Sequence, residues 1–399
     1  MRQNRLAYLL AAVTMIGPFA IDTYLPSFPA MARDLHASEL EIQQTLTAYL
    51  IPFAFMMLWH GSLSDAWGRR RIVLAGLGVF MVSSIVCALA TDVAMLWCGR
   101  MLQGLSAGVG IVVGRAIVRD LFDGPAAQRM LSKIMMLFSI APAVAPMIGG
   151  WILLLADWRG IFWFLALFSA LMLGVCRRWL PETLAPEKRQ PLYWKGLARA
   201  YCDVLLHRRF RRLAVAGALN FNAIFMYVLA APVFLIQHLK LSPQAFATMF
   251  APVVGGMALG AYLSGQAAGR ISPIRTIFGG YALMALAALL NLAVNLTMAP
   301  GIPWSIAPLP LFSIGMAMAM PSMQLLALDL FPERRGLASS CYGAVQTGLN
   351  AFSAALIVPI LWSSTLWLAG GMVVATTLGA AMFMLRNQTT SLTSAPPRD

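Results

Sequence analysis

The stretch GSLSDAWGRRRIVLAG, residues 61–76, places an acid and three consecutive arginines inside an otherwise apolar chain. Of the 399 residues, 60% are hydrophobic and only 11% are charged. Asp65 and the run Arg69–Arg71 therefore mark a place where the chain leaves an apolar environment. The apolar runs on either side of this stretch decide the class of fold.

Long runs without any charged residue show that this environment is a lipid bilayer. Residues 134–156, 276–328 and 336–385 contain no Asp, Glu, Lys or Arg. A helix needs roughly 20 apolar residues to cross the hydrocarbon core of about 30 Å. Backbone polar groups in lipid must pair within the segment, so the spans are helices. We therefore predict an all-α membrane protein with twelve spans, at residues 7–31, 43–64, 72–90, 94–117, 131–154, 160–180, 211–237, 245–267, 275–297, 303–328, 337–359 and 363–386.

The formal net charge of +14 would suggest a nucleic-acid partner, but its distribution indicates a membrane protein instead. With the N-terminus inside and the loops alternating, all but four of the 29 Lys and Arg fall on the inner side. The four exceptions are Arg33, Arg100, Arg159 and Lys240. This bias follows the positive-inside rule. We expect a multi-pass protein of the bacterial inner membrane, with both termini in the cytosol, in contact with the lipid bilayer and with no nucleic acid.

The beginning of the chain resembles a signal peptide, because two arginines precede an apolar run. No clean cleavage site of small residues follows, so we interpret it as an uncleaved first span. The five cysteines show neither a disulfide framework nor metal-ligand spacing. The sequence therefore predicts no metal, no cofactor and no catalytic residue.

One polar, basic segment, residues 181–210, separates six spans from six spans. It predicts a cytosolic linker, in which Trp194–Leu206 would form a short interfacial helix. Two halves of six spans are typical of transporters built from repeats, which bind their cargo between the halves. The predicted domains are an N-terminal bundle (1–180), the linker (181–210), a C-terminal bundle (211–388) and a disordered cytosolic tail (389–399).

The quoted stretch itself falls on a turn of about eight residues between spans 2 and 3. Gly61 and Gly68 allow close helix approach and a tight turn. Asp65, at the inner end of span 2, would face the positive N-terminus of span 11 and join the two halves. Such a contact would break when the inner side opens. In the alternative interpretation, the arginines only orient the hairpin, and Asp65 is only a polar residue that keeps the turn in contact with water.

The motifs of the first half identify a family. Gly61-x-Leu63-x-Asp65-x-x-Gly68-Arg69-Arg70-Arg71 resembles the signature of the major facilitator superfamily between spans 2 and 3. RMLQGLSAGVG (100–110) resembles the span 4 motif, and APAVAPMIGGW (141–151) resembles the span 5 motif associated with antiporters. IDTYLPSFPAM (21–31) and VRDLF (118–122) are most similar to the Bcr/CflA branch of drug:proton antiporters, named for bicyclomycin and chloramphenicol resistance.

This resemblance implies two six-helix bundles that rock about a central cavity by alternating access. Span 5 would be kinked by its prolines and would present small residues to a neighbouring helix. The residues expected to form the conformational switch are Gly61, Asp65, Gly68, Arg69, Arg70, Pro142, Pro146, Gly149 and Gly150.

Asp22 is the only acid inside a predicted span, and Arg100 is the only cation deep in one. They lie roughly 24 Å and 21 Å above the inner face, at 1.5 Å per residue. Burial favours a neutral carboxyl and a facing arginine favours a charged one, so Asp22 would take up and release a proton during transport. The alternative is a static partner of Arg100 or a residue near the outer interface.

Arg100 is expected to couple this step, donating to carbonyls freed by the span 5 prolines. Arg115 is placed at the cytosolic interface, where it can snorkel, and topology explains Arg119 and Asp120 beyond it.

Several uncharged residues are candidates for the substrate cavity. Amide side chains in spans 7 and 11 are surrounded by bulky, adaptable ones, and such a loose apolar pocket suits varied drugs. In the alternative, each of them packs or bonds between helices. The candidates are Tyr24, Met56, Asn220, Phe221, Asn222, Phe225, Met226, Gln346 and Asn350.

These observations favour a proton-driven efflux transporter of small amphipathic compounds, such as chloramphenicol or bicyclomycin, acting as a monomer. The alternative function is an exporter or symporter of a metabolite such as a sugar or an amino acid. A membrane enzyme is disfavoured, because the sequence has neither paired carboxylates nor His/Cys metal spacing. It also lacks a nucleotide-binding loop, so ATP is not the energy source in this chain.

Overall fold

The computed structural model describes residues 3–189, 192 and 194–391. All regular structure in these ranges is helical, and twelve segments are long and apolar enough to span a membrane. The predicted fold class is thereby confirmed. The twelve segments are Arg5–Asp34, Glu39–Trp67, Arg69–Ala88, Val93–Leu121, Arg129–Leu155, Arg159–Trp179, Arg208–Leu229, Pro243–Ala267, Pro273–Thr297, Pro308–Leu328, Pro332–Leu361 and Thr365–Leu385.

Seven spans are single α-helices or nearly so, and five are interrupted. The first group comprises α4 (Glu39–Trp67), α5 (Arg69–Ala88), α10 (Arg159–Trp179), α12 (Arg208–Leu229), α14 (Pro273–Thr297), α15 (Pro308–Leu328) and α18 (Thr365–Ser391). The second comprises α1 (Gln3–Thr14), α2 (Ile16–Asp22), η1 (Leu25–Ser27) and α3 (Phe28–Asp34) in span 1; α6 (Val93–Ala107) and α7 (Val109–Leu121) in span 4; α8 (Gly124–Phe138) and α9 (Ala141–Leu155) in span 5; η4 (Pro243–Phe246) and α13 (Ala247–Ala267) in span 8; and η5 (Pro332–Arg334), α16 (Arg335–Phe352), η6 (Ser353–Ile357) and α17 (Val358–Leu361) in span 11.

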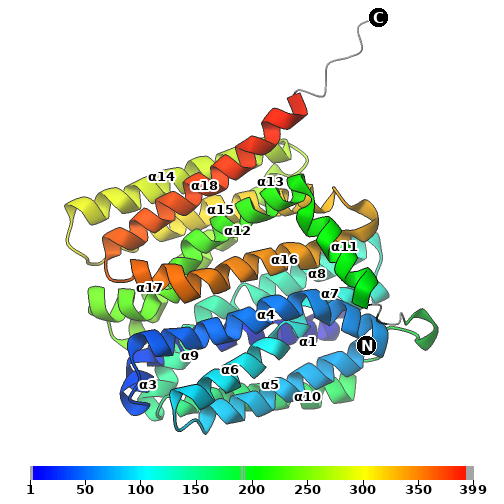
Figure 1. Ribbon diagram of the computed structural model, residues 1–399, viewed down its shortest axis with the longest axis horizontal. Helices are drawn as coiled ribbons and strands as arrows, with labels where there is room; N and C mark the ends of the chain where they lie inside the picture. Colours follow the sequence, from blue (N-terminus) through cyan, green and yellow to red (C-terminus); the bar gives the residue numbers. More distant parts are fainter. Residues whose placement is uncertain (1–2, 190–191, 193, 392–399) are drawn as a thin grey trace, which may run out of the picture.

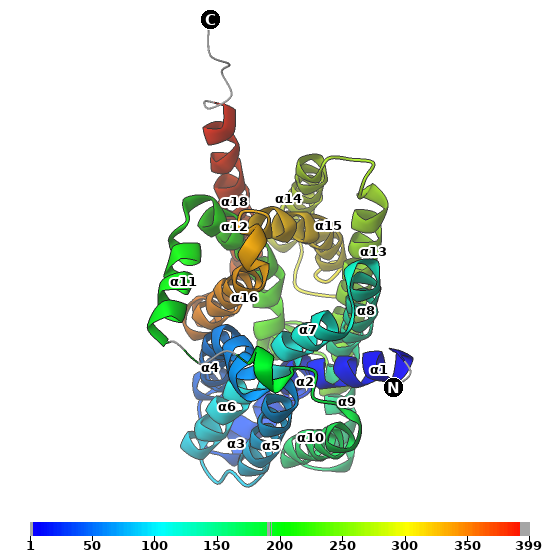
Figure 2. The ribbon, with the colours of Figure 1, turned by 90° about the vertical axis from the view of Figure 1, so that its right-hand side faces the viewer.

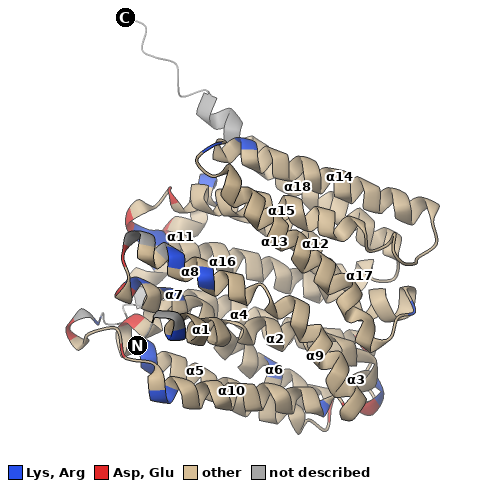
Figure 3. Ribbon diagram, turned by 180° about the vertical axis from the view of Figure 1, so that it is seen from behind, with Lys and Arg blue, Asp and Glu red and all other residues tan. Residues whose placement is uncertain are grey.

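The helices form two groups, which we call the N half (α1–α10) and the C half (α12–α18) (Figures 1 and 2). Helix α11 (Trp194–Leu206) lies at the end of the bundle where α1 begins and α18 ends. Most Lys and Arg gather at this same end (Figure 3). We call it the basic face, and the other end, which holds α3, the opposite face.

The connecting segment and the C-terminal helix refine two sequence predictions. Helix α11 has the bounds predicted for the short helix of the linker, and the 3₁₀ turn η2 (Pro186–Lys188) precedes it. Helix α18 continues to Ser391, three residues into the predicted disordered tail. The remainder of that tail, residues 392–399, lies outside the described residues.

Prolines explain where the interrupted spans break. A proline has no backbone N–H for the carbonyl four residues earlier, and its ring clashes with that carbonyl. Pro26 stands four residues after Asp22, where α2 ends. Pro142 stands four residues after Phe138, where α8 ends. Span 1 is therefore broken directly after its acidic residue, and span 5 is broken near its middle, as the motif predicts.

Glycines in span 4 bring it close to spans 1 and 2. A Cβ atom at Gly104 would lie 2.1 Å from the carbonyl oxygen of Tyr49, and one at Gly110 would lie 2.6 Å from that of Val13. Only glycine permits helix backbones to approach this closely. The RMLQGLSAGVG motif thus fixes α6 and α7 against α4 and α1, and so places the side chain of Arg100.

Candidate functional site

Asp22 is the last residue of α2 and lies in the interior of the N half. Its side chain is 5% exposed, and among the described residues it forms no hydrogen bond or ion pair. Buried charges are usually paired, because removing a charge from water is costly. The break at Thr23 places this carboxyl where helix geometry is already interrupted. An ionisable residue inside a membrane span is a candidate functional site.

Arg100 is fully buried in α6, and no ion pair joins it to Asp22 among the described residues. Its Nη1 donates to Oε1 of Gln103 at 2.6 Å, and Gln103 in turn donates to Ser84. Its Nε and Nη2 have no hydrogen-bond partner in the part of the chain that the structure describes. The predicted bonds to span 5 carbonyls are absent from these contacts. The static ion pair with Asp22, the alternative considered above, is not present in this structure.

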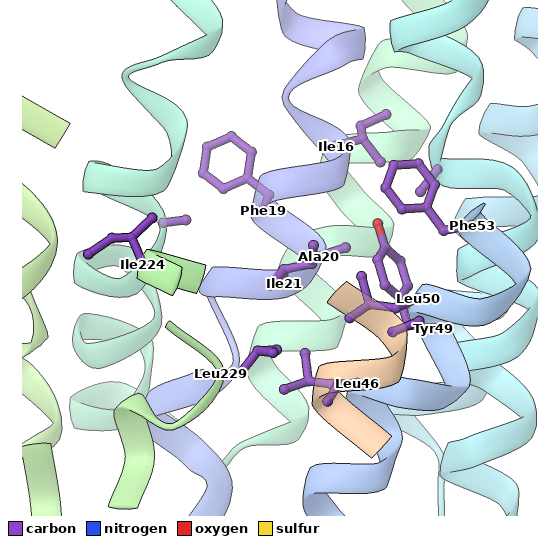
Figure 4. Packing of buried hydrophobic residues seen from close by; sticks show 14 of the residues in the cluster. Ile16, Phe19, Ala20, Ile21, Leu46, Tyr49, Leu50, Phe53, Ile224 and Leu229 are labelled. Atoms are coloured by element: carbon purple, nitrogen blue, oxygen red, sulfur yellow. The ribbon is translucent and has the colours of Figure 1, made fainter. Parts of the chain in front are cut away.

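Two tyrosines hold the guanidinium instead. The Cζ atom of Arg100 lies 4.3 Å from the ring centroid of Tyr24 and 4.5 Å from that of Tyr49. A desolvated cation over aromatic faces gains about 2 kcal/mol. Tyr49 extends from α4 toward Ala20 of α2 (Figure 4). Tyr24 is fully buried and shares a 3.0 Å hydrogen bond with Thr45. Tyr24 thus packs against Arg100, and Tyr49 is a residue that the sequence analysis did not identify.

The loop between α4 and α5 is built around Gly68 and Glu182. Gly68 has φ +98°, and a Cβ there would lie 2.4 Å from Oε2 of Glu182. The Glu182 carboxylate accepts hydrogen bonds from the backbone N–H groups of Arg69 (2.9 Å) and Arg70 (3.3 Å). A carboxylate at this place satisfies free donors and opposes the positive end of the helix dipole. Glu182 therefore caps α5 from the segment after span 6.

Arg69 is the centre of the switch motif. Its Nη1 lies 2.5 Å from Oδ1 of Asp65 and its Nε lies 3.0 Å from Oδ2 of Asp120. Nη1 also donates to Ser64 at 2.7 Å. Asp120 accepts a further bond from Thr183 at 2.8 Å. The planar guanidinium thus ties spans 2 and 4 to the start of span 3, and Asp120 has a partner that topology alone did not predict.

The prediction that Asp65 contacts span 11 is wrong for this structure: among the described residues Asp65 forms no hydrogen bond or ion pair with that span. Asp65 is paired with Arg69 within the N half, because Gly68 turns the chain so that Arg69 returns toward α4. At the basic face a hydrogen bond between the halves comes from Arg115 of α7, whose Nη1 donates to Oγ of Ser339 in α16 at 3.5 Å. Helix α16 also packs against α4, so both α4 and α7 of the N half face α16 of the C half.

Replacing Arg69 with Lys is expected to destabilise the protein. A lysine has one ammonium group and cannot reproduce the fork that contacts Asp65, Asp120 and Ser64 together. We expect the melting temperature of the purified protein to fall by several degrees. Arg71→Lys, at an exposed position of the same run, is the matched control. Equal melting temperatures for the two variants would contradict this role of Arg69.

At the opposite face the halves are held more tightly. Gln44 donates to the carbonyl of Ala355 at 3.1 Å, and Gln237 donates to Glu39 at 2.6 Å. Gln244 donates to the carbonyl of Gly150 at 3.3 Å. These three bonds all join the N half to the C half, whereas the Arg115 bond at the basic face is long. Among the described residues, more hydrogen bonds therefore join the halves at the opposite face than at the basic face.

The glycines of the span 5 motif lie at two close contacts. A Cβ at Gly149 would lie 1.8 Å from the carbonyl oxygen of Thr23, so α9 touches the break in span 1. A Cβ at Gly150 would lie 3.0 Å from the carbonyl oxygen of Pro243 in the C half. One glycine therefore serves packing inside the N half, and its neighbour serves the contact between the halves.

The predicted substrate residues fall into separate groups. Asn222 donates to Asn350 at 3.1 Å and accepts from Ser353 at 2.8 Å, which links spans 7 and 11. Asn220 donates to Tyr281 at 2.9 Å inside the C half. Phe221 and Phe225 stack at 5.5 Å and stay partly exposed, as do Met56 and Gln346, whereas Met226 is buried. Their role in binding substrate stays a prediction.

Two cavities between the halves are lined by other residues. The one at the basic face has a volume of about 530 Å³ and is lined by residues of α4, α7, α11 and α16. We call it the basic-face cavity. Its lining includes Asp65, Arg69, Arg115, Arg119, Asp120, Tyr201, Gly336, Ser339 and Ser340. The second, of about 690 Å³ at the opposite face, is lined by residues that include Arg33, Asp34, Trp158 and Gln244.

The chain is similar to known proteins in both sequence and fold. The family model described as Major Facilitator Superfamily matches residues 10–354. The chain is 32% identical to the multidrug resistance protein MdtL of Escherichia coli O81, over 84% of this chain and 83% of that protein. It is 28% identical to the bicyclomycin resistance protein homolog of Haemophilus influenzae, over 95% and 96%. The crystal structure of a D-xylose–proton symporter superposes with a TM-score of 0.72 at 16% identity, over 94% and 96%.

Proposed function

This chain belongs to the major facilitator superfamily, and from that premise we propose that it is a proton-driven exporter of small amphipathic drugs. Members of this family are transporters and not enzymes. The similarity to proteins named for bicyclomycin and multidrug resistance supports drug export. It also agrees with the Bcr/CflA resemblance of the span 1 motif.

The observation that carries the coupling to protons is the state of Asp22. It is a buried carboxyl at a helix break, without an ion pair or hydrogen bond among the described residues. Arg100, the cation buried in span 4, is held by Gln103 and two tyrosine rings. A carboxyl that is not fixed by a salt bridge is free to bind a proton when it faces one side and to release it when it faces the other.

We place the basic face in the cytosol of a bacterial inner membrane, on the positive-inside rule. In this proposal the basic-face cavity is the space that cargo enters from the cytosol. Cargo would bind between the halves, and the halves would rock so that the opposite face opens. A proton on Asp22 would accompany the return, in a monomer without a cofactor.

Drug susceptibility of a host without its own efflux pumps tests this function. Cells that express the protein should survive higher concentrations of chloramphenicol, bicyclomycin or a sulfonamide than cells with an empty vector. Everted vesicles should release protons when a transported compound is added. Resistance without proton release would remove the coupling, and resistance to none of the compounds would favour a metabolite as cargo.

A further inference from the structure

We propose that the basic-face cavity binds the anionic group of a substrate through Arg115, Arg119 and the first turns of α16. This inference deepens the proposed function and rests on it in one respect, that cargo approaches from the basic face. The chemical class of the ligand is an amphipathic compound with a carboxylate, phosphate or ionised sulfonamide group.

Some charged residues of the cavity lining form ion pairs with each other, and others do not. Three arginines and two aspartates face the cavity, which gives the lining a net positive charge. Both aspartates, Asp65 and Asp120, are held by Arg69 at 2.5 and 3.0 Å. Among the described residues, Arg115 and Arg119 have no carboxylate within 4.0 Å. Two guanidinium groups are therefore available for an anion.

The C half adds positive potential and hydroxyl donors from the other side. Helix α16 is 18 residues long and begins at Arg335, so its positive dipole end faces the cavity. A Cβ at Gly336 would lie 3.3 Å from Nη1 of Arg119. Ser339 and Ser340 follow on the cavity side, and Ser339 accepts the long bond from Arg115. Arginine forks and helix N-terminal donors together are a favourable environment for carboxylate or phosphate.

The position of these groups makes them relevant to transport. The cavity lies between α4 and α7 of the N half and α16 of the C half, under α11. Tyr201 of α11 donates to the carbonyl of Leu58 in α4, which keeps α11 over this space. Cargo that moves between the halves from the basic face passes both arginines. A cleft lined by one sign of charge raises the local concentration of opposite charges and repels like ones. The geometry therefore favours anionic cargo over cationic cargo.

Binding of two related dyes tests the site directly. The probes are fluorescein, which is anionic, and rhodamine 6G, which is cationic, with full-length protein in nanodiscs of zwitterionic lipid. We expect fluorescence polarisation to show tighter binding of fluorescein, by about tenfold, as expected for a charge-lined cleft. The double variant Arg115→Gln/Arg119→Gln should remove this preference. Arg270→Gln removes an arginine of the same face that does not line the cavity, and it should change the preference by less than about twofold, since a charge away from the bound dye is screened.

A second variant guards against misfolding of the first. Ser339→Asp places a carboxylate opposite Arg115 near the start of α16, where acidic residues are tolerated. It should weaken fluorescein binding without removing any arginine. The proposal is overturned if both variants bind fluorescein as the unmodified protein does, or if Arg270→Gln weakens binding as much as they do.

The same experiments distinguish a lipid headgroup from a soluble substrate. They also distinguish failure of this inference from failure of the proposed function. If phosphatidylglycerol in the nanodiscs displaces fluorescein, the occupant is a lipid headgroup and the substrate site is overturned. Unchanged binding in that lipid supports a soluble substrate. Dye binding requires no transport. Binding through the arginines without drug export in cells would therefore overturn the proposed function alone. Export without any charge preference would overturn this inference alone.

Discussion

Asp22→Asn is expected to abolish drug resistance while leaving the protein folded. Asparagine keeps the shape of the side chain but cannot bind or release a proton. Because Asp22 has no hydrogen bond or ion pair among the described residues, the substitution removes no such contact and leaves no described partner unpaired. The substitution should therefore abolish the coupling of drug export to proton movement and leave the melting temperature unchanged.

The measurement combines resistance with exchange. At matched expression, Asp22→Asn cells should be as susceptible as cells with an empty vector, and their everted vesicles should release no protons on addition of drug. Exchange of labelled for unlabelled drug across vesicles at equal pH should persist, because it needs no net proton movement. Asp123→Asn, at an exposed acid near the basic face, is the matched control and should keep full resistance. Resistance retained by Asp22→Asn would remove this residue from the mechanism.

Gly149→Ala is expected to destabilise the N half more than any other substitution that adds a single methyl group in span 5. The added Cβ would lie 1.8 Å from the carbonyl oxygen of Thr23, which is backbone and cannot rotate away. Helix α9 would have to move from the break in span 1, next to Asp22. Overpacking of this kind costs about 1–3 kcal/mol, occasionally more.

Thermal unfolding in detergent and the yield of monodisperse protein measure this effect. Gly78→Ala in α5 and Gly174→Ala in α10 are matched controls, because a Cβ at either position meets nothing within 4 Å. We expect both controls to melt at or slightly above the temperature of the unmodified protein, since alanine favours a helix over glycine. A Gly149→Ala protein that melts with the controls would show that α9 can shift without cost.

Drug resistance of cells that express the glycine variants shows how the same substitutions affect transport. Gly150→Ala should be milder than Gly149→Ala, because its Cβ would lie 3.0 Å from the carbonyl of Pro243 across the halves. That contact joins the halves at the opposite face, which opens during transport in the proposed mechanism. A small clash there should favour opening and should change the transport rate more than the melting temperature.

The local pattern of the sequence was sufficient for the membrane architecture. Apolar runs of span length predict helices because lipid offers no hydrogen bonds to an unpaired backbone. Trp194–Leu206 was predicted with the observed bounds, because its polar surroundings isolate it clearly. The breaks in spans 1 and 5 follow from prolines, whose effect is confined to one turn of helix.

The partners of the functional side chains were decided only by the tertiary structure. Asp22 and Arg100 were placed at similar depths from sequence, yet depth along a helix does not say which way a side chain points. Tyr49 reaches Arg100 because Gly104 lets α6 approach α4, a contact between residues far apart in the chain. No periodicity in either helix indicates that pairing.

The motif of residues 61–71 also shows what the sequence indicates and what only the tertiary structure decides. Its composition was enough to predict a tight, charged turn between spans 2 and 3. Its electrostatics depend on Asp120 and Glu182, which come from the ends of spans 4 and 6. Charges act through space and not along the chain, so the sequence determined which charges this protein carries at its basic face. Only the packing of the helices decided that Arg69 satisfies both aspartates and leaves Arg115 and Arg119 facing the cavity.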